Sequence, residues 1–284
     1  MKPFLKWAGG KRQILTYIKK YLNNDLIDKR ATYYEPFVGG GSLFFDLARN
    51  NCVINDYNSE IINVYKVIKD HPIGLIRMLK THQKKDSINY YYSIRNMDKN
   101  SSFKKMGNVK KAARTIYLNK TCFNGLFRVN KEGYFNTPRG KYSNPLICDE
   151  SNIREISIFL NNNDIQILNN DFEEACPDIK SGDYVYFDPP YDYENENGFV
   201  SYNANGFSRK DLIRLKLFCD KLIELGCIVL ISNNDTTFVR ELFNDNNYKI
   251  VYEIKQIKAN RNINSSGKKR AKKVHEVLIY GKRK

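Results

Sequence analysis

The stretch Tyr184–Tyr191 reads YVYFDPPY: an apolar run that stops at one acidic residue and two prolines. Four consecutive apolar residues bounded by turn signals predict a buried strand over Tyr184–Phe187. The prolines end that strand and hold the backbone extended, because proline has no N–H for a ladder and restricts the residue before it. In an open α/β sheet, ligands bind beyond the carboxyl ends of such strands. We therefore expect a site at Asp188.

The turn after this strand presents three groups to a ligand. The Asp188 carboxylate and the Pro189 carbonyl can each accept one N–H, and the ring of Tyr191 can stack on a planar face. Pro190 keeps the turn extended. This set fits a planar base that bears an exocyclic amine. A strand that simply ends in a tight proline turn carries the same residues, so the interpretation depends on the rest of the chain.

The bulk composition bounds the class of protein. The chain has 284 residues, of which 42% are hydrophobic, enough for one sizeable core with an inserted module. Its formal net charge of +16 favours a polyanionic partner. The abundance of Lys, Asn, Ile and Tyr is also what AT-rich genes encode, so charge alone leaves this open.

Cysteine and histidine usage narrows the chemistry. The six cysteines are scattered without a C-x-x-C pair, which predicts reduced, mostly buried thiols. The three histidines are isolated, so we expect neither a metal site nor a Ser-His-Asp triad. No signal peptide precedes Pro3 and no apolar run has the length of a membrane span, so we expect a cytoplasmic protein.

Two segments place glycines before a helix. FLKWAGGK (Phe4–Lys11) leads into an amphipathic helical pattern. Lys11 can therefore hold an anionic group at the N-terminus of that helix. The alternative is an ordinary turn with Trp7 in the core. Tyr33–Phe37 predicts a strand, and VGGGS follows before a second helix. This is the layout of a nucleotide-type cofactor loop without the full G-x-G-x-x-G.

Two acidic residues end further predicted strands. Cys52–Asp56 places Asp56 where a carboxylate can accept both hydroxyls of a ribose, although an N-cap for the next helix is the alternative. The strand Asp164–Leu168 precedes Asp171 and Phe172. This pair can hydrogen-bond and cover an adenine ring, or it can be a helix cap with a core Phe.

The strand–helix alternation stops between residues 59 and 161. Helical patterns over Ile61–Ile68, Pro72–Thr81 and Lys110–Lys120 predict an inserted module, with the catalytic domain formed by residues 1–58 and 162–284. The segment Phe103–Lys120 is rich in basic residues, which we expect to face a polyanion: Lys104, Lys105, Lys110, Lys111, Arg114 and Lys120.

A turn and a hairpin come after that basic helix. Arginine side chains there can read guanine, and an apolar tip such as Leu126 can wedge between stacked bases. A solvated helical subdomain is the alternative.

The C-terminal part returns to the sheet pattern. Ser208 is expected to cap a helix that runs to Leu225, and a buried strand follows over Cys227–Ile231. The last two strands are predicted over Tyr248–Ile254 and Val274–Tyr280. The polar loop 192–205 is placed to close over the site, and the basic loop 255–273 suits contact with phosphates.

Four motifs occur in a fixed order along the chain: KWAGGK (Lys6–Lys11), PFVGGG (Pro36–Gly41), ND (Asn55-Asp56) and DPPY (Asp188–Tyr191). The chain thereby resembles the Dam family of DNA adenine-N6 methyltransferases, including the methylases of GATC-type restriction systems. The family's target-recognition segment resembles Asn119–Tyr142.

The resemblance implies the fold and the reaction. The expected fold is α/β, a Rossmann-like class I S-adenosylmethionine-dependent methyltransferase sheet, mostly parallel with an antiparallel last strand, plus an inserted, mainly helical target-recognition domain. The expected reaction moves a methyl group from S-adenosyl-L-methionine to N6 of a flipped-out adenine in double-stranded DNA, within GATC. A restriction endonuclease that shares the site is suggested, without a stable complex.

The resemblance also implies roles for individual residues. The catalytic residues would be Asp188, Pro189, Pro190 and Tyr191. The cofactor-binding residues would be Trp7, Lys11, Phe37, Gly39, Gly41, Asp56, Asp171, Phe172 and Asp188. The DNA-binding residues would be Lys6, Asn124, Leu126, Arg128, Pro138, Lys141, Tyr142, Lys268 and Arg270. Phe123 stands where relatives often have Tyr, and Lys141 where some have Arg, which puts base specificity in doubt rather than chemistry.

Three other functions stay open from the residues alone. Methylation of cytosine N4 or of RNA uses the same amine-binding chemistry. A catalytically silent DNA-binding protein on the same scaffold is less consistent with an intact Asp56 and Asp188. A nicotinamide oxidoreductase is disfavoured by the incomplete glycine fingerprint.

Overall fold

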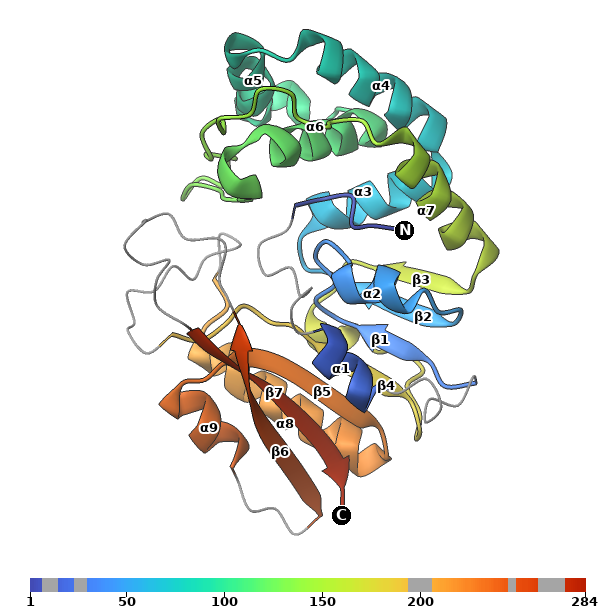
Figure 1. The fold of residues 1–284 in the computed structure, drawn as a ribbon, viewed down its shortest axis with the longest axis vertical. Helices are drawn as coiled ribbons and strands as arrows, with labels where there is room; N and C mark the ends of the chain where they lie inside the picture. The colour runs from blue at the N-terminus through green and yellow to red at the C-terminus, as the bar shows by residue number, and fades with distance from the viewer. Residues whose placement is uncertain (7–14, 23–29, 194–205, 245–248, 260–273) are drawn as a thin grey trace.

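A seven-stranded sheet with strand order β3-β2-β1-β4-β5-β7-β6 runs through the lower half of the molecule (Figure 1). The computed structural model describes residues 1–6, 15–22, 30–193, 206–244, 249–259 and 274–284. The strands are β1 Tyr33–Glu35, β2 Cys52–Asn55, β3 Ile165–Leu168, β4 Tyr184–Phe187, β5 Ile228–Asn234, β6 Ile250–Ala259 and β7 Val274–Arg283.

The pairing confirms the expected sheet. The first five strands pair in parallel, whereas β7 runs antiparallel to both β5 and β6. All residues of β1, β2 and β4 are buried, as expected for central parallel strands covered on both faces.

Helices cover both faces. The helices of the sheet region are α1 Leu15–Tyr21, α2 Ser42–Leu47, α8 Arg209–Leu225 and α9 Thr237–Phe243. Leu215 and Cys219 of α8 pack with Phe187 and Val229 on one face, while Tyr186 and Leu230 belong to the core on the other face. The predicted cap of α8 is confirmed, since the Ser208 side chain accepts from the N–H of the third helical residue.

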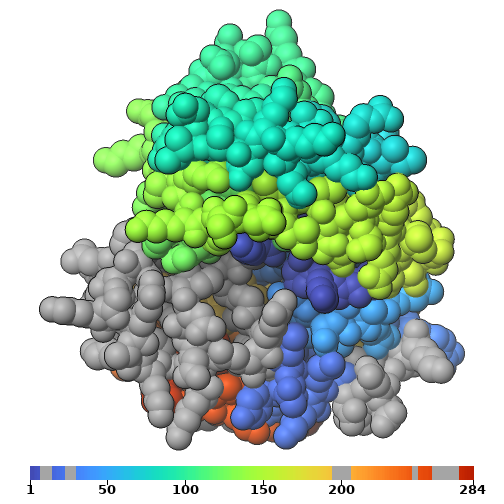
Figure 2. All heavy atoms as spheres, turned by 45° about the horizontal axis from the view of Figure 1, so that its top comes forward, coloured from blue at the N-terminus to red at the C-terminus, as the bar shows by residue number. Residues whose placement is uncertain are grey.

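Five helices form the upper half, where three were predicted: α3 Ser59–Asp70, α4 Pro72–Lys85, α5 Ile88–Arg95, α6 Asn108–Thr121 and α7 Glu150–Asn162. The prediction did not name α5 and α7. Figure 2 shows the insert, coloured cyan to yellow-green, forming the upper part of this face of the molecule. Tyr65 of α3 and Leu160 of α7 share one core with Phe44 and Ile54, so the hydrophobic core continues from the sheet into the insert. The boundaries at residues 58 and 162 stay a prediction.

Two expectations about basic residues are wrong. Arg114 is only 1% exposed, and its guanidinium pairs with the Asp98 carboxylate at 2.7 Å instead of facing a polyanion. Residues 255–259 continue β6 rather than beginning the basic loop, because β7 offers backbone partners along this whole length. No helix in the described ranges has the length and apolar character needed to span a membrane. The six cysteines are free thiols, of which five are buried.

Candidate functional site

The carboxyl ends of β2, β1 and β4 meet at one edge of the sheet, because the three strands are adjacent and parallel. The registers align the carboxyl-terminal parts of the three strands. Glu35 of β1 lies opposite Ile54 of β2, and Tyr34 lies opposite Val185 of β4.

Asp56 directly follows β2 and Asp188 directly follows β4, so together with Phe37, in the turn after β1, they form a row at this edge. Neighbouring strands are about 4.8 Å apart, so the row is roughly 10 Å wide. Asp188 is half-buried and Pro189 is buried. A single ligand of nucleoside size can therefore contact the acidic ends of two strands.

Asp56 joins the end of β2 to the glycine turn. Its Oδ2 accepts from the Gly39 N–H at 2.9 Å, and its Oδ1 accepts from the Asn58 N–H at 2.9 Å. The N-cap of α3 is Asn58, so the alternative of Asp56 as the cap is wrong. Burial raises the pKa of the Asp56 carboxyl to about 6, against the effect of the two N–H donors. Each carboxylate oxygen can accept a second hydrogen bond, as from a hydroxyl.

The glycine turn is closely packed against α3. Gly41 has a φ of 72°, and a Cβ there would overlap the Tyr65 hydroxyl and lie 2.9 Å from Phe45 Cε2. The same hydroxyl donates to the Gly39 carbonyl at 3.2 Å. Only glycine fits at position 41, because a Cβ would meet side chains of α2 and α3 and the backbone has a positive φ.

Aromatic rings cluster around Phe37. The rings of Phe37 and Phe172 stack with centroids 5.7 Å apart, and Phe207 meets Phe37 edge-on at 5.8 Å. Asp171 caps the 3-10 helix Phe172–Glu174 and pairs with Arg214 at 3.0 Å. The capping alternative for Asp171 is therefore present in the structure, and its contact with an adenine stays a prediction.

A buried carboxyl lies close to Asp188. Glu35 is 3% exposed and its Oε2 accepts from the Tyr33 hydroxyl at 2.8 Å. Burial, together with the nearby charge of Asp188, raises the pKa of the Glu35 carboxyl to about 8. The sequence analysis did not name Glu35 as a site residue, although an acidic residue inside a predicted central strand is an unusual feature.

The turn after Asp188 is anchored on β5, on the start of α8 and on the N-cap residue of α9. The Asp192 N–H donates to Asn233 Oδ1 at 2.9 Å, and the Asp192 carboxylate accepts from Thr236 at 2.7 Å and from Arg209 at 2.9 Å. These three anchoring residues were also missed. Polar residues at the end of β5 were the available signal, since β5 is the strand next to β4.

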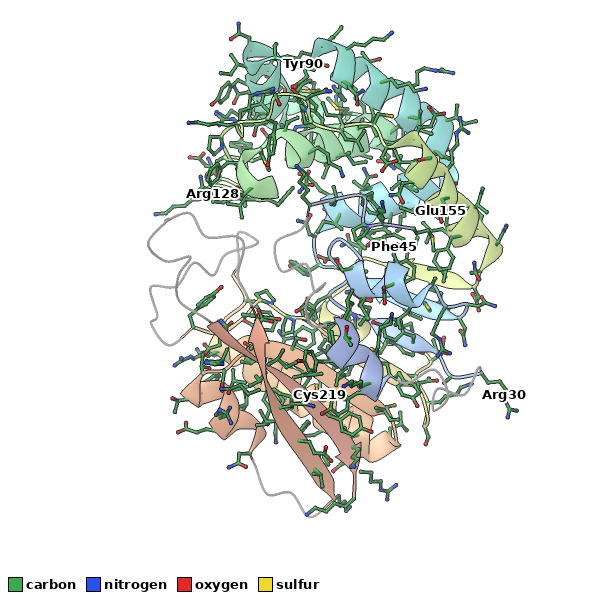
Figure 3. The ribbon with its side chains drawn as sticks, viewed as in Figure 1. Arg30, Phe45, Tyr90, Arg128, Glu155 and Cys219 are labelled. Carbon is green, nitrogen blue, oxygen red and sulfur yellow. The ribbon has the colours of Figure 1, made fainter. Side chains whose placement is uncertain are left out.

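The predicted hairpin in the insert is confirmed by two antiparallel bridges, Cys122↔Arg139 and Val129↔Phe135. Arg128 is exposed and points away from the helices (Figure 3). Its Nε donates to Asn136 Oδ1 at 2.7 Å across the hairpin.

The other candidate residues of the insert surround this hairpin. Asn124 has a positive φ of 54°, and the Leu126 carbonyl accepts from Thr137 at 2.8 Å. The Pro138 carbonyl accepts from the Phe123 N–H at 2.9 Å. Lys141 is exposed, and Lys6 Nζ lies 4.2 Å from the centroid of the Tyr142 ring.

Arg139, on the same hairpin, has a structural role. Its guanidinium forms two hydrogen bonds with the Asp86 carboxylate, at 2.6 and 2.8 Å, and Asp86 also accepts from the Tyr117 hydroxyl at 2.7 Å. Of the two hairpin arginines, Arg128 is therefore the one placed to contact a partner.

Four predicted site residues, Trp7, Lys11, Lys268 and Arg270, lie outside the described residues. So does most of the polar loop 192–205. Within the described ranges, no group of three or more His, Cys, Asp or Glu side chains is placed to hold a metal ion.

Comparison with known proteins gives a consistent result. A family model described as D12 class N6 adenine-specific DNA methyltransferase matches residues 7–263. The chain is 42% identical to the Type II methyltransferase M1.LlaDCHI of Lactococcus lactis subsp. cremoris, over 99% of this chain and 96% of that protein. It is 39% identical to the Type II methyltransferase M.MjaIII of Methanocaldococcus jannaschii, over 98% of each. It is 30% identical to the DNA adenine methylase of Escherichia coli (strain K12), over 99% of this chain and 95% of that protein.

Proposed function

Because the chain belongs to the D12 class of N6 adenine-specific DNA methyltransferases, we propose that the row Asp56, Phe37 and Asp188 brings methyl donor and target adenine together. Enzymes of this family methylate N6 of adenine in DNA with S-adenosylmethionine as the donor. Cytosine-N4 methylation, RNA methylation and a silent DNA-binding role are thereby disfavoured. The position of the two acids directly after β2 and β4, on either side of β1, is the observation that supports the proposal.

The residues of the row fit the methyl donor. Asp56 offers acceptors for ribose hydroxyls, the side-chain-free turn at Gly39 and Gly41 admits an amino-acid moiety, and the paired rings of Phe37 and Phe172 offer an apolar face to adenine. When bound, S-adenosylmethionine supplies an electrophilic methyl group. The residues of this chain bind and orient the two reactants.

Asp188 and the Pro189 carbonyl accept the two N6 hydrogens of the target adenine in this proposal. The N6 lone pair is otherwise delocalised into the ring, and this contact directs it out of the ring plane. Positive charge develops on N6 in the transition state, so a fixed carboxylate stabilises that state more than the ground state. Removing the base from the duplex costs a few kcal/mol, and stacking on Tyr191 offsets part of this.

The test is methyl transfer by Asp188→Ala and Asp188→Asn variants. We expect turnover to fall by roughly 10²–10³-fold, the scale for removing one preorganised group. Asn keeps the shape but turns an N–H donor toward the amine. The exposed Asp70, at the end of α3, provides the control Asp70→Ala, which should retain turnover. Near-normal methylation by Asp188→Ala would refute the assignment.

We also propose that the hairpin Cys122–Arg139 reads the DNA sequence, with Arg128 contacting guanine and GATC as the site. The exposure of Arg128 and the net charge of +16 support this. The Type II names of two relatives support a cognate restriction endonuclease that shares the site. We propose that the protein acts in the cytoplasm. Sequencing the modified adenines in DNA exposed to the protein tests the site directly. Methylation spread over unrelated sequences would contradict it.

A further inference from the structure

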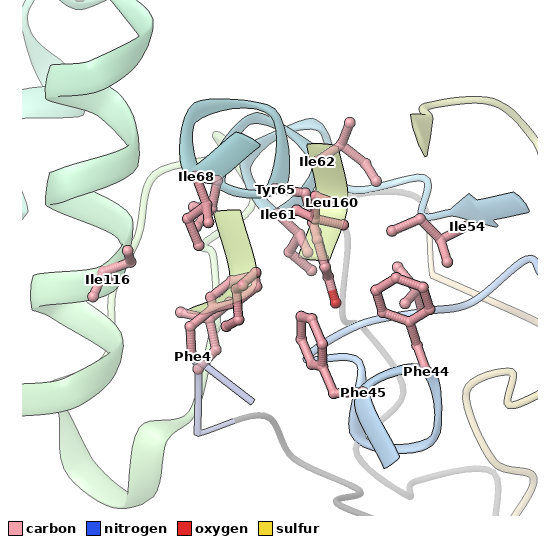
Figure 4. Packing of buried hydrophobic residues seen from close by; sticks show 14 of the residues in the cluster. Phe4, Phe44, Phe45, Ile54, Ile61, Ile62, Tyr65, Ile68, Ile116 and Leu160 are labelled. Carbon is pink, nitrogen blue, oxygen red and sulfur yellow. The ribbon is translucent and has the colours of Figure 1, made fainter. Parts of the chain in front are cut away.

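The N-terminal residues 4–6 lie between the glycine turn and the recognition hairpin. The ring of Phe4 meets the rings of Tyr65 and Phe45 edge-on, with centroids 4.8 and 6.0 Å apart (Figure 4). The Tyr65 hydroxyl donates to the Gly39 carbonyl at 3.2 Å. One end of this segment is thus packed against the support of the proposed cofactor site.

The other end of the segment is bound by one buried amide. Asn119 of α6 is 1% exposed. Its Oδ1 accepts from the Lys6 N–H at 2.7 Å, and its Nδ2 donates to the Lys6 carbonyl at 2.9 Å and to the Gly125 carbonyl at 3.0 Å. The side chain therefore joins residue 6 to the turn that opens the hairpin. An amide is required, because only it supplies one acceptor and two donors with this shape.

The contact between Lys6 and the hairpin leaves no free space. Gly125 has a φ of +67°, and a Cβ there would lie 2.6 Å from Lys6 Cβ and 2.7 Å from the Lys6 carbonyl oxygen. A displacement of residue 6 toward the hairpin must therefore move the Gly125 turn. Described contacts run without a break from Gly39 through Tyr65 and Phe4 to this turn.

We infer that Asn119 is a positioning residue that couples the proposed cofactor site to the recognition hairpin, so that ligand binding at the glycine turn and DNA engagement strengthen each other. The inference rests on the proposed function. Such coupling is reciprocal for binding free energies, and typical values change affinity by about 5–150-fold. The packed chain of contacts is the physical route, and a coupling measurement is what tests it.

The chain contains a matched control. Asn152 of α7 binds residue 2 in the same way: its Oδ1 accepts from the Lys2 N–H at 2.8 Å and its Nδ2 donates to the Lys2 carbonyl at 2.9 Å. It is 8% exposed, and no bond to the hairpin is among its described contacts. Asn152→Leu therefore loosens the same N-terminal segment without breaking the link to Gly125.

The experiment measures the dissociation constant of a duplex that carries the sequence found to be methylated by the protein, with and without saturating S-adenosylhomocysteine. The dissociation constant without the ligand divided by the constant with the ligand measures the coupling between the two sites. We expect the wild-type protein and Asn152→Leu to bind DNA roughly tenfold more tightly with the ligand. Asn119→Leu and Asn119→Asp should bring the ratio to within about twofold of one, because both lose the donors to Lys6 and Gly125.

Two results would overturn the inference: a wild-type ratio near one, or a folded Asn119 variant that keeps the full ratio. Circular dichroism at the assay temperature establishes folding. If both Asn119 variants are unfolded, Gly125→Ala decides, because its Cβ displaces the hairpin from Lys6 and should also reduce the ratio. Methyl transfer by Asp188→Ala is read separately, so failure of the proposed catalytic site is distinguishable from failure of this coupling.

Discussion

Replacing Glu35 by glutamine should remove a pH-dependent loss of stability from this protein. The Glu35 carboxyl is buried in a central strand, and burial raises its pKa from 4.5 to about 8. The folded state therefore favours the protonated carboxyl. This contribution to the free energy of unfolding is complete below pH 4.5. Above pH 4.5 the carboxyl ionises in the unfolded chain but not in the folded chain, so the contribution decreases and is lost as the pH rises through 8.

The magnitude follows from the size of the shift. Each pH unit above 4.5, up to about 8, lowers the wild-type free energy of unfolding by about 1.4 kcal/mol through this group. At pH 7 the accumulated loss is about 3 kcal/mol. Glutamine stays neutral at every pH, and its carbonyl can accept from the Tyr33 hydroxyl as Glu35 does at 2.8 Å. The raised pKa of Asp56 is common to both proteins and cancels in their difference.

Urea unfolding of both proteins at pH 5.5, 7.0 and 8.5 measures this difference. Between pH 5.5 and pH 8.5, the free energy of unfolding of Glu35→Gln should increase by about 3 kcal/mol relative to that of the wild-type protein. Glu174→Gln, at an exposed position, is the control and should change stability little at any pH. A difference between wild type and Glu35→Gln that is equal at all three pH values would refute the reasoning, because Glu35 would then fold as a carboxylate.

Three further substitutions separate recognition, support and cofactor binding. Arg128→Ala should cost about 1–3 kcal/mol of discrimination at one base pair, measured on duplexes with single substitutions; an equal loss on every sequence would instead indicate a phosphate contact. Arg139→Ala should lower the free energy of unfolding by about 3 kcal/mol in urea, since it leaves Asp86 without its bidentate partner, and an unchanged unfolding midpoint would contradict this. Gly41→Ala should weaken S-adenosylhomocysteine binding at least about tenfold by calorimetry, because its Cβ displaces the Tyr65 hydroxyl at a φ of 72°; unchanged affinity would show that the turn does not hold the ligand.

Local patterns predicted most of the strands and helices in their order along the chain, although not α5 and α7. The apolar run before Asp188, the glycines after Phe37 and the cap at Ser208 each act through neighbours in the chain. These patterns predicted the central strands and the sheet edge with Asp56 and Asp188, whereas the parallel sheet with its antiparallel last strand was expected from the resemblance to the family. It did not predict residues 255–259 as strand, because β7 supplies the partners for that stretch.

The roles of individual polar residues required the folded chain. Arg114 and Arg128 were both expected from the sequence to face DNA. In the structure, Arg114 is buried against Asp98, whereas Arg128 is exposed. Asn119 is hydrogen-bonded to Lys6, which is 113 residues away, and Glu35 is buried because β1 lies between two other strands. Secondary structure follows from short-range sterics and hydrogen bonds, so it is encoded locally. Burial, ionisation and hydrogen-bond partners depend on which distant segments meet, and that is settled only when the chain packs.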